Sequence, residues 1–185
     1  WSSDVCSSDL EEHESEPTGD VVFALDVAPN RESASIAVAG TSSEDGVHIE
    51  IVECRDGVAW LPRRVGELWE RWGGRFGIAV GSPAWSLLPE LRESGAELFE
   101  VTVSAHAQAC GSFVDAINER KVRIVRHPRL SDAVTVAKVK HYGDTWLWAR
   151  RNTEVDISPL VAATLARWTF LNPAADPVDA APIFA

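Results

Sequence analysis

Long apolar runs, a signal peptide and an even set of cysteines are all missing from this sequence of 185 residues. No stretch holds eighteen consecutive apolar residues, and the first residues form neither a basic segment nor an apolar run of signal-peptide type. We therefore expect a soluble, intracellular protein. The three cysteines, Cys6, Cys54 and Cys110, lack the spacing of a metal motif, which argues against both a disulfide framework and a zinc site.

A phosphate-binding loop of the G-x-x-x-x-G-K-[ST] type is missing as well. The nearest glycine-rich piece, RWGGRFG at residues 71–77, lacks the lysine and precedes an expected strand instead of a helix. We therefore do not expect this chain to hydrolyse ATP.

What the sequence does contain is enough apolar material, 45% of its residues, to build one folded domain, which we expect at residues 21–171. Residues 1–10, WSSDVCSSDL, resemble a translated sequencing-adapter remnant, and residues 11–20 are acidic, as in a disordered linker. Residues 172–185 are rich in proline and alanine and are expected to be an irregular tail. The natural chain is then expected to extend further upstream.

Charge is unevenly distributed along the chain. The net charge is −11, and residues 1–20 carry seven acidic side chains and no lysine or arginine. Residues 120–151 reverse this balance, with nine basic and two acidic side chains, or +7. A basic segment within an acidic protein is typical of a phosphate-binding surface, although a solvated face paired with acids elsewhere would give the same count.

Three expected strands come first in the chain, at residues 21–27, 34–40 and 48–54, and the short turns between them indicate an antiparallel meander. Strands and helices then alternate, which favours parallel strands. The expected elements of this second part are helices at residues 61–72, 86–93, 105–118 and 129–137, strands at residues 76–80 and 97–101, and a short extended piece at residues 122–125.

The last two expected elements are a hairpin and a helix. The hairpin, at residues 140–151, turns at Gly143 and Asp144, and the helix begins with Ser158 as the N-cap and Pro159 in the first turn. The whole order is that of an α/β, ribonuclease H-like fold, in which a mixed sheet of an antiparallel three-strand meander plus parallel strands is flanked by helices.

Two acids stand where such a fold brings distant segments together. Asp26 ends the first strand and Asp156 precedes the last helix, so their carboxylates would meet and could bind hard divalent cations that support phosphodiester hydrolysis. Each acid also has a simpler reading, since Asp26 could bond turn amides and Asp156 could face the positive end of the helix dipole. Where a third acid is wanted, after the strand at residues 76–80, the chain has Gly81.

Four sequence blocks, in order, resemble the C-terminal nuclease domain of the large terminase subunit of tailed phages. They are FALDVAPNRESASIAVAG (23–40), GSPAWSLLPELRESG (81–95), AHAQACGSFVDAI (105–117) and GDTWLWARRNTEVDISPLVAATLARW (143–168), of which the last is the most specific. The resemblance covers residues 21–171. It implies a ribonuclease H-like fold and the metal-dependent, endonucleolytic cutting of concatemeric double-stranded DNA during genome packaging, in the cytoplasm of an infected bacterium.

The resemblance also implies the roles of individual residues. Asp26 and Asp156 would be the catalytic acids and the ligands of Mg²⁺ or Mn²⁺ in a two-metal site, which Gly81 would weaken, and Glu53 at the end of the third strand is expected to lie too far away to replace the missing acid. The DNA-binding side chains would be Arg120, Lys121, Arg123, Lys138, Lys140, Arg150 and Arg151. The implied partners are double-stranded DNA, the terminase small subunit, the portal protein and an upstream ATPase domain missing from this chain.

Two alternatives stay open. The chain could have the same fold with a site disabled at Gly81, binding DNA or motor without cutting, or it could be another ribonuclease H-like enzyme such as a junction resolvase or integrase, against which the block DISPLVAATLA argues. Trp146 and Trp148 alternate along one strand, and packing against the last helix is favoured over stacking on DNA. His106 and Cys110, at helical spacing, are expected to be packed side chains and not metal ligands.

Overall fold

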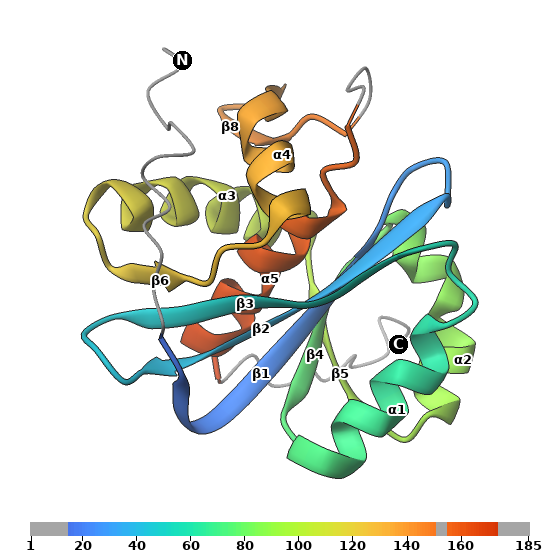
Figure 1. Ribbon diagram of the computed structural model, residues 1–185. Coiled ribbons are helices and arrows are strands. Elements are labelled where there is room, and N and C mark those ends of the chain that lie inside the picture. The colour runs from blue at the N-terminus through green and yellow to red at the C-terminus, as the bar shows by residue number, and fades with distance from the viewer. Residues whose placement is uncertain (1–14, 151–154, 174–185) are drawn as a thin grey trace, which may run out of the picture.

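A six-stranded mixed sheet forms the centre of the computed structural model, which describes residues 15–150 and 155–173 (Figure 1). Strands β1 (Pro17–Val27), β2 (Ser33–Ser42) and β3 (Val47–Asp56) form the antiparallel meander. Strands β4 (Arg75–Ala79) and β5 (Glu97–Val101) extend it in parallel beyond β1, and β6 (Val122–Ile124) lies parallel to β3 at the other edge. The strand order β5-β4-β1-β2-β3-β6 confirms the predicted mixed sheet.

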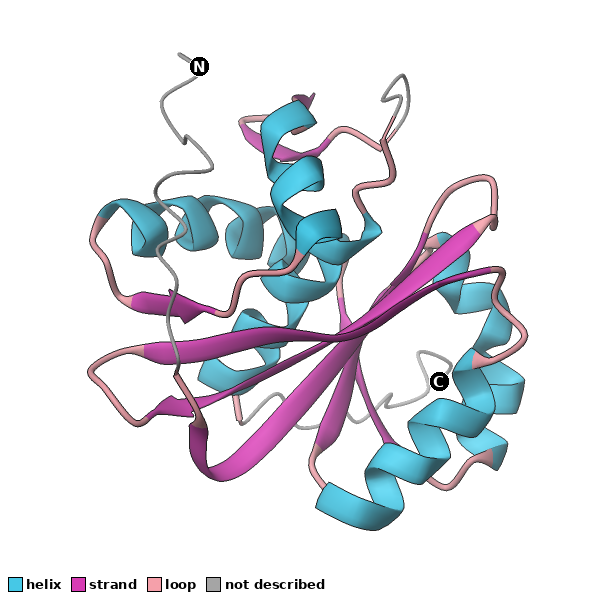
Figure 2. Ribbon diagram, viewed as in Figure 1, coloured by secondary structure: helices cyan, strands magenta, loops and turns pink. Residues whose placement is uncertain are grey.

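Helices cover both faces of this sheet (Figure 2). One face packs against α1 (Leu61–Trp72), the 3₁₀ helix η2 (Pro83–Leu87) and α2 (Leu88–Glu93). The other face packs against α3 (Val103–Asn118), α4 (Pro128–Val136) and α5 (Ser158–Leu171), with the hairpin of β7 (Val139–Tyr142) and β8 (Thr145–Trp148) on the same side. The sheet therefore separates two hydrophobic cores.

The alternation of side chains along β1 decides which of the two cores Asp26 borders. Leu25 points into the core with α1 and α2, whereas Ala24 belongs to the core with α5. Asp26, two residues after Ala24, therefore lies on the α5 face, and so does Ser35, its cross-strand partner on β2.

Small side chains allow α5 to approach the sheet closely. On β4, Gly77 lies so near α5 that a Cβ atom placed on it would come within 2.2 Å of the Thr169 hydroxyl oxygen. Next to it on β1 is Ala24, its register partner. This close approach places the start of α5, and with it Asp156, over the end of β1.

Two of the differences between the structure and the expected element boundaries have a clear physical cause. Strand β1 begins at Pro17, four residues before the expected start of the domain, because Pro17 and Thr18 pair with Ser42 and Thr41 of an equally extended β2. The helix expected at residues 86–93 is divided into η2 and α2, since Pro89 cannot donate the backbone hydrogen bond that would make them continuous. Among the described residues, no helix has the length and apolar character needed to cross a membrane.

Candidate active site

An ion pair between distant parts of the chain closes the end of β1. The Asp26 side chain is 1% exposed, and its Oδ1 accepts a short hydrogen bond from the Arg150 guanidinium, which follows β8 in the chain. The same guanidinium donates to the carbonyl oxygen of Val27 over 3.1 Å. The second carboxylate oxygen of Asp26, Oδ2, is buried and has no hydrogen-bond partner among the described residues.

Asp156 lies at the start of α5 and is held by three hydrogen bonds. Its Oδ1 accepts from the backbone N–H of Ser158 at 2.8 Å, and its Oδ2 accepts from the hydroxyls of Ser158 at 2.7 Å and Ser33 at 2.6 Å. Ser158 is thus the first residue of the helix and not its N-cap, a position that Ile157 takes. The capping oxygen comes from Asp156, because its side chain reaches the N–H two residues ahead.

The electrostatics of this site are dominated by burial. Loss of solvent raises the pKa of Asp26 from 3.8 to about 6, against the charge and the hydrogen bond of Arg150, which lower it. The nearby negative charge of Asp156 adds a smaller rise to the same pKa. The two acids named from the sequence are therefore brought close enough to repel each other.

A third acid does not stand on β4. Phe23 and Ala24 of β1 pair with Phe76 and Gly77 of β4, and continuing this parallel register by two residues places Ala79 beside Asp26 on the α5 face. Gly81 comes two residues later, in the turn after the strand, with a φ of 71° and open space around it. The position of β4 that lies beside Asp26 is thus Ala79, which the sequence did not single out.

The oxygen lone pairs that the hydrogen bonds leave unused determine which metal ions these residues could bind. Each carboxylate oxygen offers two lone pairs, so Oδ2 of Asp26 and one lone pair on Oδ1 of Asp156 are not used by the hydrogen bonds described above. Within residues 15–150 and 155–173, no group of three or more His, Cys, Asp or Glu side chains is placed to hold a metal ion. The donors that the described residues bring to this point are therefore two carboxylates, which are oxygen ligands of the kind that hard divalent cations prefer.

His106 lies on the α3 side of the Arg150 guanidinium. It is 8% exposed, its Nε2 has no hydrogen-bond partner in the described part of the chain, and burial together with the charge of Arg150 lowers its pKa to about 4. Burial raises the pKa of the Cys110 thiol to about 12, so it is not a thiolate at neutral pH. Both side chains are packed, as predicted, but their position beside Arg150 has no signal in the sequence.

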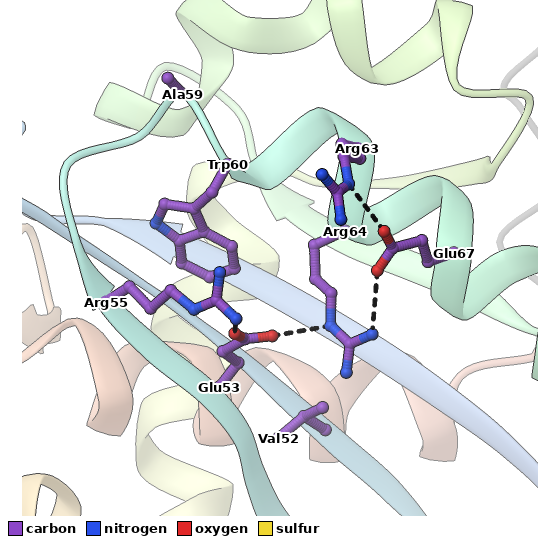
Figure 3. Close-up of a pocket in the computed structure, with 8 residues that line it drawn as sticks. All are labelled: Val52, Glu53, Arg55, Ala59, Trp60, Arg63, Arg64 and Glu67. Atoms are coloured by element: carbon purple, nitrogen blue, oxygen red, sulfur yellow. Dashed lines mark hydrogen bonds and ion pairs between the residues drawn. The ribbon is translucent and has the colours of Figure 1, made fainter.

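Glu53, which was expected to lie too far from Asp26, is separated from it by the sheet itself. It pairs with Ile36 of β2, whose side chain faces α1, and so it points to the opposite face of the sheet from Asp26. There it accepts a 2.7 Å hydrogen bond from Arg64 and forms an ion pair with Arg55 (Figure 3). These groups border a hollow of about 680 Å³ between β3 and α1, lined by Val52, Glu53, Arg55, Ala59, Trp60, Arg63, Arg64 and Glu67.

The basic side chains predicted to contact DNA come from separate parts of the fold. Arg120, Lys121 and Arg123 follow α3 and lie beside the start of β3, where the backbone N–H of Val47 donates to the carbonyl of Lys121. Asp26 pairs with Ser35 of β2, and Ser35 pairs with Cys54 near the other end of β3. At about 3.3 Å per residue, the two ends of β3 lie roughly 20 Å apart.

Of the remaining predicted residues, Lys138 and Lys140 are exposed at the β7–β8 hairpin, and Arg150 is part of the site itself. Arg123 is largely engaged with Glu44, at 3.1 Å. Arg151 lies outside the described residues.

Trp148 confirms that the hairpin packs against the last helix. Its side chain is 6% exposed, and its indole N–H donates to the Thr164 hydroxyl of α5 at 3.0 Å. Trp146 meets it edge-on, with ring centroids 5.0 Å apart. This packing holds the segment that carries Arg150 against the site.

Known structures that this chain resembles include phage large terminases and their nuclease domains. The chain aligns with the large terminase of bacteriophage HK97 at a TM-score of 0.70 and 12% identity, over 88% of this chain but only 42% of that one. It aligns with the large terminase nuclease of thermophilic phage G20c at 0.66 and 14% identity, over 89% and 96% of the two chains. Another structure of the G20c nuclease contains magnesium.

A variant nuclease domain of the large terminase subunit of bacterial virus Sf6, with manganese, aligns at a TM-score of 0.58 and 10% identity, over 82% of this chain and 89% of that one. No model of a protein family matches the sequence, and the search of curated proteins gave no match. At these identities the likeness establishes the fold, which is the ribonuclease H-like fold of terminase nucleases.

Proposed function

We propose, from the premise that the chain has the fold of terminase nucleases, that it is the endonuclease domain of a phage large terminase subunit and cuts double-stranded DNA with a divalent cation, Mg²⁺ or Mn²⁺. The observation that carries this proposal is the meeting of Asp26 and Asp156 at one point of the fold, with oxygen lone pairs left unused. In that role the domain would act on concatemeric DNA in an infected bacterium, with a packaging ATPase, the small subunit and the portal as partners.

The residues of the site have distinct tasks in this proposal. Asp26 and Asp156 would hold the cation, and Ser33 and Ser158 orient the Asp156 carboxylate through its Oδ2. When bound, the cation would act as a Lewis acid that activates water and stabilises negative charge on the phosphate. The exposed Lys138 and Lys140 of the β7–β8 hairpin would neutralise phosphates of the duplex without reading its sequence.

A second candidate function is DNA binding without cutting, and the environment of β4 favours it. Ala79 and Gly81 provide no carboxylate on the α5 face, and Arg150 already neutralises Asp26. Because a hard cation with only two carboxylate ligands binds more weakly, this copy of the site could retain its DNA contacts and lose its cutting activity.

Nicking of supercoiled plasmid in the presence of Mn²⁺ separates the two candidates. We expect the wild-type chain to nick, Asp26→Asn to reduce the rate at least 100-fold, and Asp132→Asn, on the exposed part of α4, to leave it unchanged. Ala79→Asp should increase the rate more than Gly81→Asp, since position 79 adjoins Asp26 in the register and position 81 has a left-handed backbone.

The outcomes are distinguishable. Nicking that survives Asp26→Asn would overturn the assignment of the site. Nicking that appears only with Ala79→Asp or Gly81→Asp would establish the second candidate, a correctly folded but disabled site.

A further inference from the structure

We infer that Arg150 is an internal cation that occupies the Asp26 carboxylate in place of a divalent ion, so that loading the site with metal is an exchange in which the guanidinium must withdraw. This inference rests on the proposed function and concerns how its metal site is regulated.

The contacts of Arg150 show that the guanidinium is anchored at two points. One terminal nitrogen donates to Oδ1 of Asp26, and the other donates to the carbonyl oxygen of Val27 at the end of the same strand. Two donors fixed on the end of β1 hold a positive charge directly against the carboxylate that would bind the divalent ion.

Burial explains why some cation must be there. The Asp26 side chain is 1% exposed, and an ionised carboxylate out of water is costly unless an opposite charge is adjacent. Within the described residues, Arg150 is the cationic group that hydrogen-bonds to Asp26, and His106 of α3, which lies near Arg150, is neutral at neutral pH. The carboxylate therefore depends on Arg150 until a metal ion arrives.

The guanidinium and a divalent ion exclude each other at this carboxylate. Two cations within a few ångströms repel strongly in a buried site, and the acids that the described residues bring there to offset them are Asp26 and Asp156, since β4 contributes Ala79. Arg150 has a route to solvent, because its side chain is 18% exposed while that of Asp26 is 1% exposed. Its removal should therefore strengthen metal binding.

The test measures Mn²⁺ affinity directly, by the electron paramagnetic resonance signal of free Mn²⁺, on the whole chain. Arg150→Gln should bind Mn²⁺ at least tenfold more tightly than the wild type, and Asp26→Asn combined with Arg150→Gln should lose this gain. The matched control is Arg123→Gln, because Arg123 has a similar exposure, 19%, and pairs with an acid, Glu44, far from the site. This control should leave the Mn²⁺ affinity unchanged.

Equal or weaker Mn²⁺ binding by Arg150→Gln overturns the inference while leaving the metal site of the proposed function intact. Absence of Mn²⁺ binding in every variant overturns the metal site itself. Should Arg150→Gln fail to fold, the wild type gives the answer by NMR, because Mg²⁺ must shift the Arg150 side-chain N–H signal and leave that of Arg123 in place. An Arg150 signal that does not respond to saturating Mg²⁺ overturns the exchange.

Discussion

Burial favours the neutral form of Asp26 and of His106, two titratable side chains near Arg150, with opposite consequences for stability. The pKa of Asp26 rises from 3.8 to about 6, so the folded state binds a proton more tightly than the unfolded state, and its contribution to stability falls as the pH rises through this window. The pKa of His106 falls from 6.5 to about 4, so its contribution is lost as the pH falls from 6.5 to 4.

We expect these two contributions to cancel in the wild type and to appear separately in variants. Each difference in pKa is a little more than 2, which corresponds to about 3 kcal/mol. Relative to the wild type, Asp26→Asn should lose about 3 kcal/mol of unfolding free energy between pH 7 and pH 4, and His106→Gln should gain about as much.

Urea unfolding at several pH values measures this difference, because ionisations elsewhere in the chain are common to all three proteins and cancel. Parallel pH dependence of the two variants would contradict the placement of both side chains beside Arg150.

At the scale of elements, the start of α5 depends on one carboxylate. Asp156 caps the helix through Ser158 and connects it to β2 through Ser33, so the same side chain has a structural role besides the proposed metal ligation. Asp156 therefore favours the helix N-terminus, as the simpler interpretation of the sequence had it, and this role is compatible with the proposed metal ligation.

Replacing this cap should destabilise the fold even without metal. We expect Asp156→Ala to lower the unfolding free energy by about 2 kcal/mol, because three donors lose their acceptor in a half-buried position. Ser33→Ala, which removes one of the three bonds, should cost about 1 kcal/mol.

The matched control is Asp132→Ala on the exposed side of α4, which should stay within about 0.5 kcal/mol of the wild type. Chemical denaturation in EDTA checks all three variants, and an Asp156→Ala protein as stable as the control would remove the structural role.

At the scale of the molecule, the basic side chains fall into two groups that come from different parts of the chain. Lys138 and Lys140 belong to the hairpin that leads into the site, whereas Arg120 and Lys121 lie at the far end of β3. Under the proposed function, we expect the hairpin group to bind the DNA that reaches Asp26.

We expect Lys138→Ala with Lys140→Ala to weaken binding of duplex DNA and to reduce the slope of log affinity against log salt by about 2, since two phosphate contacts are lost. Arg120→Ala with Lys121→Ala removes the same charge at the distant site and should leave both quantities close to those of the wild type. Fluorescence anisotropy over a salt series compares them, and an equal loss in both double variants would mean that charge alone, and not position, governs binding.

The sequence by itself determined the order of strands and helices, because apolar periodicity and turn residues are local signals. It also located Asp26 and Asp156 at element ends, and the packing of Trp148 against α5 followed from the alternation of its strand. The absence of an acid after the fourth strand was visible as well.

Only the tertiary structure decided which side chains surround the two acids. The bond from Arg150 to Asp26 joins residues 124 positions apart, and that from Ser33 to Asp156 joins residues 123 apart. Strand register also decides that Ala79 lies beside Asp26 and that Glu53 points to the α1 face of the sheet. The positions of the basic residues depend on the same register. Register and long-range contacts arise when the sheet and α5 pack together, and no local pattern in the sequence encodes them.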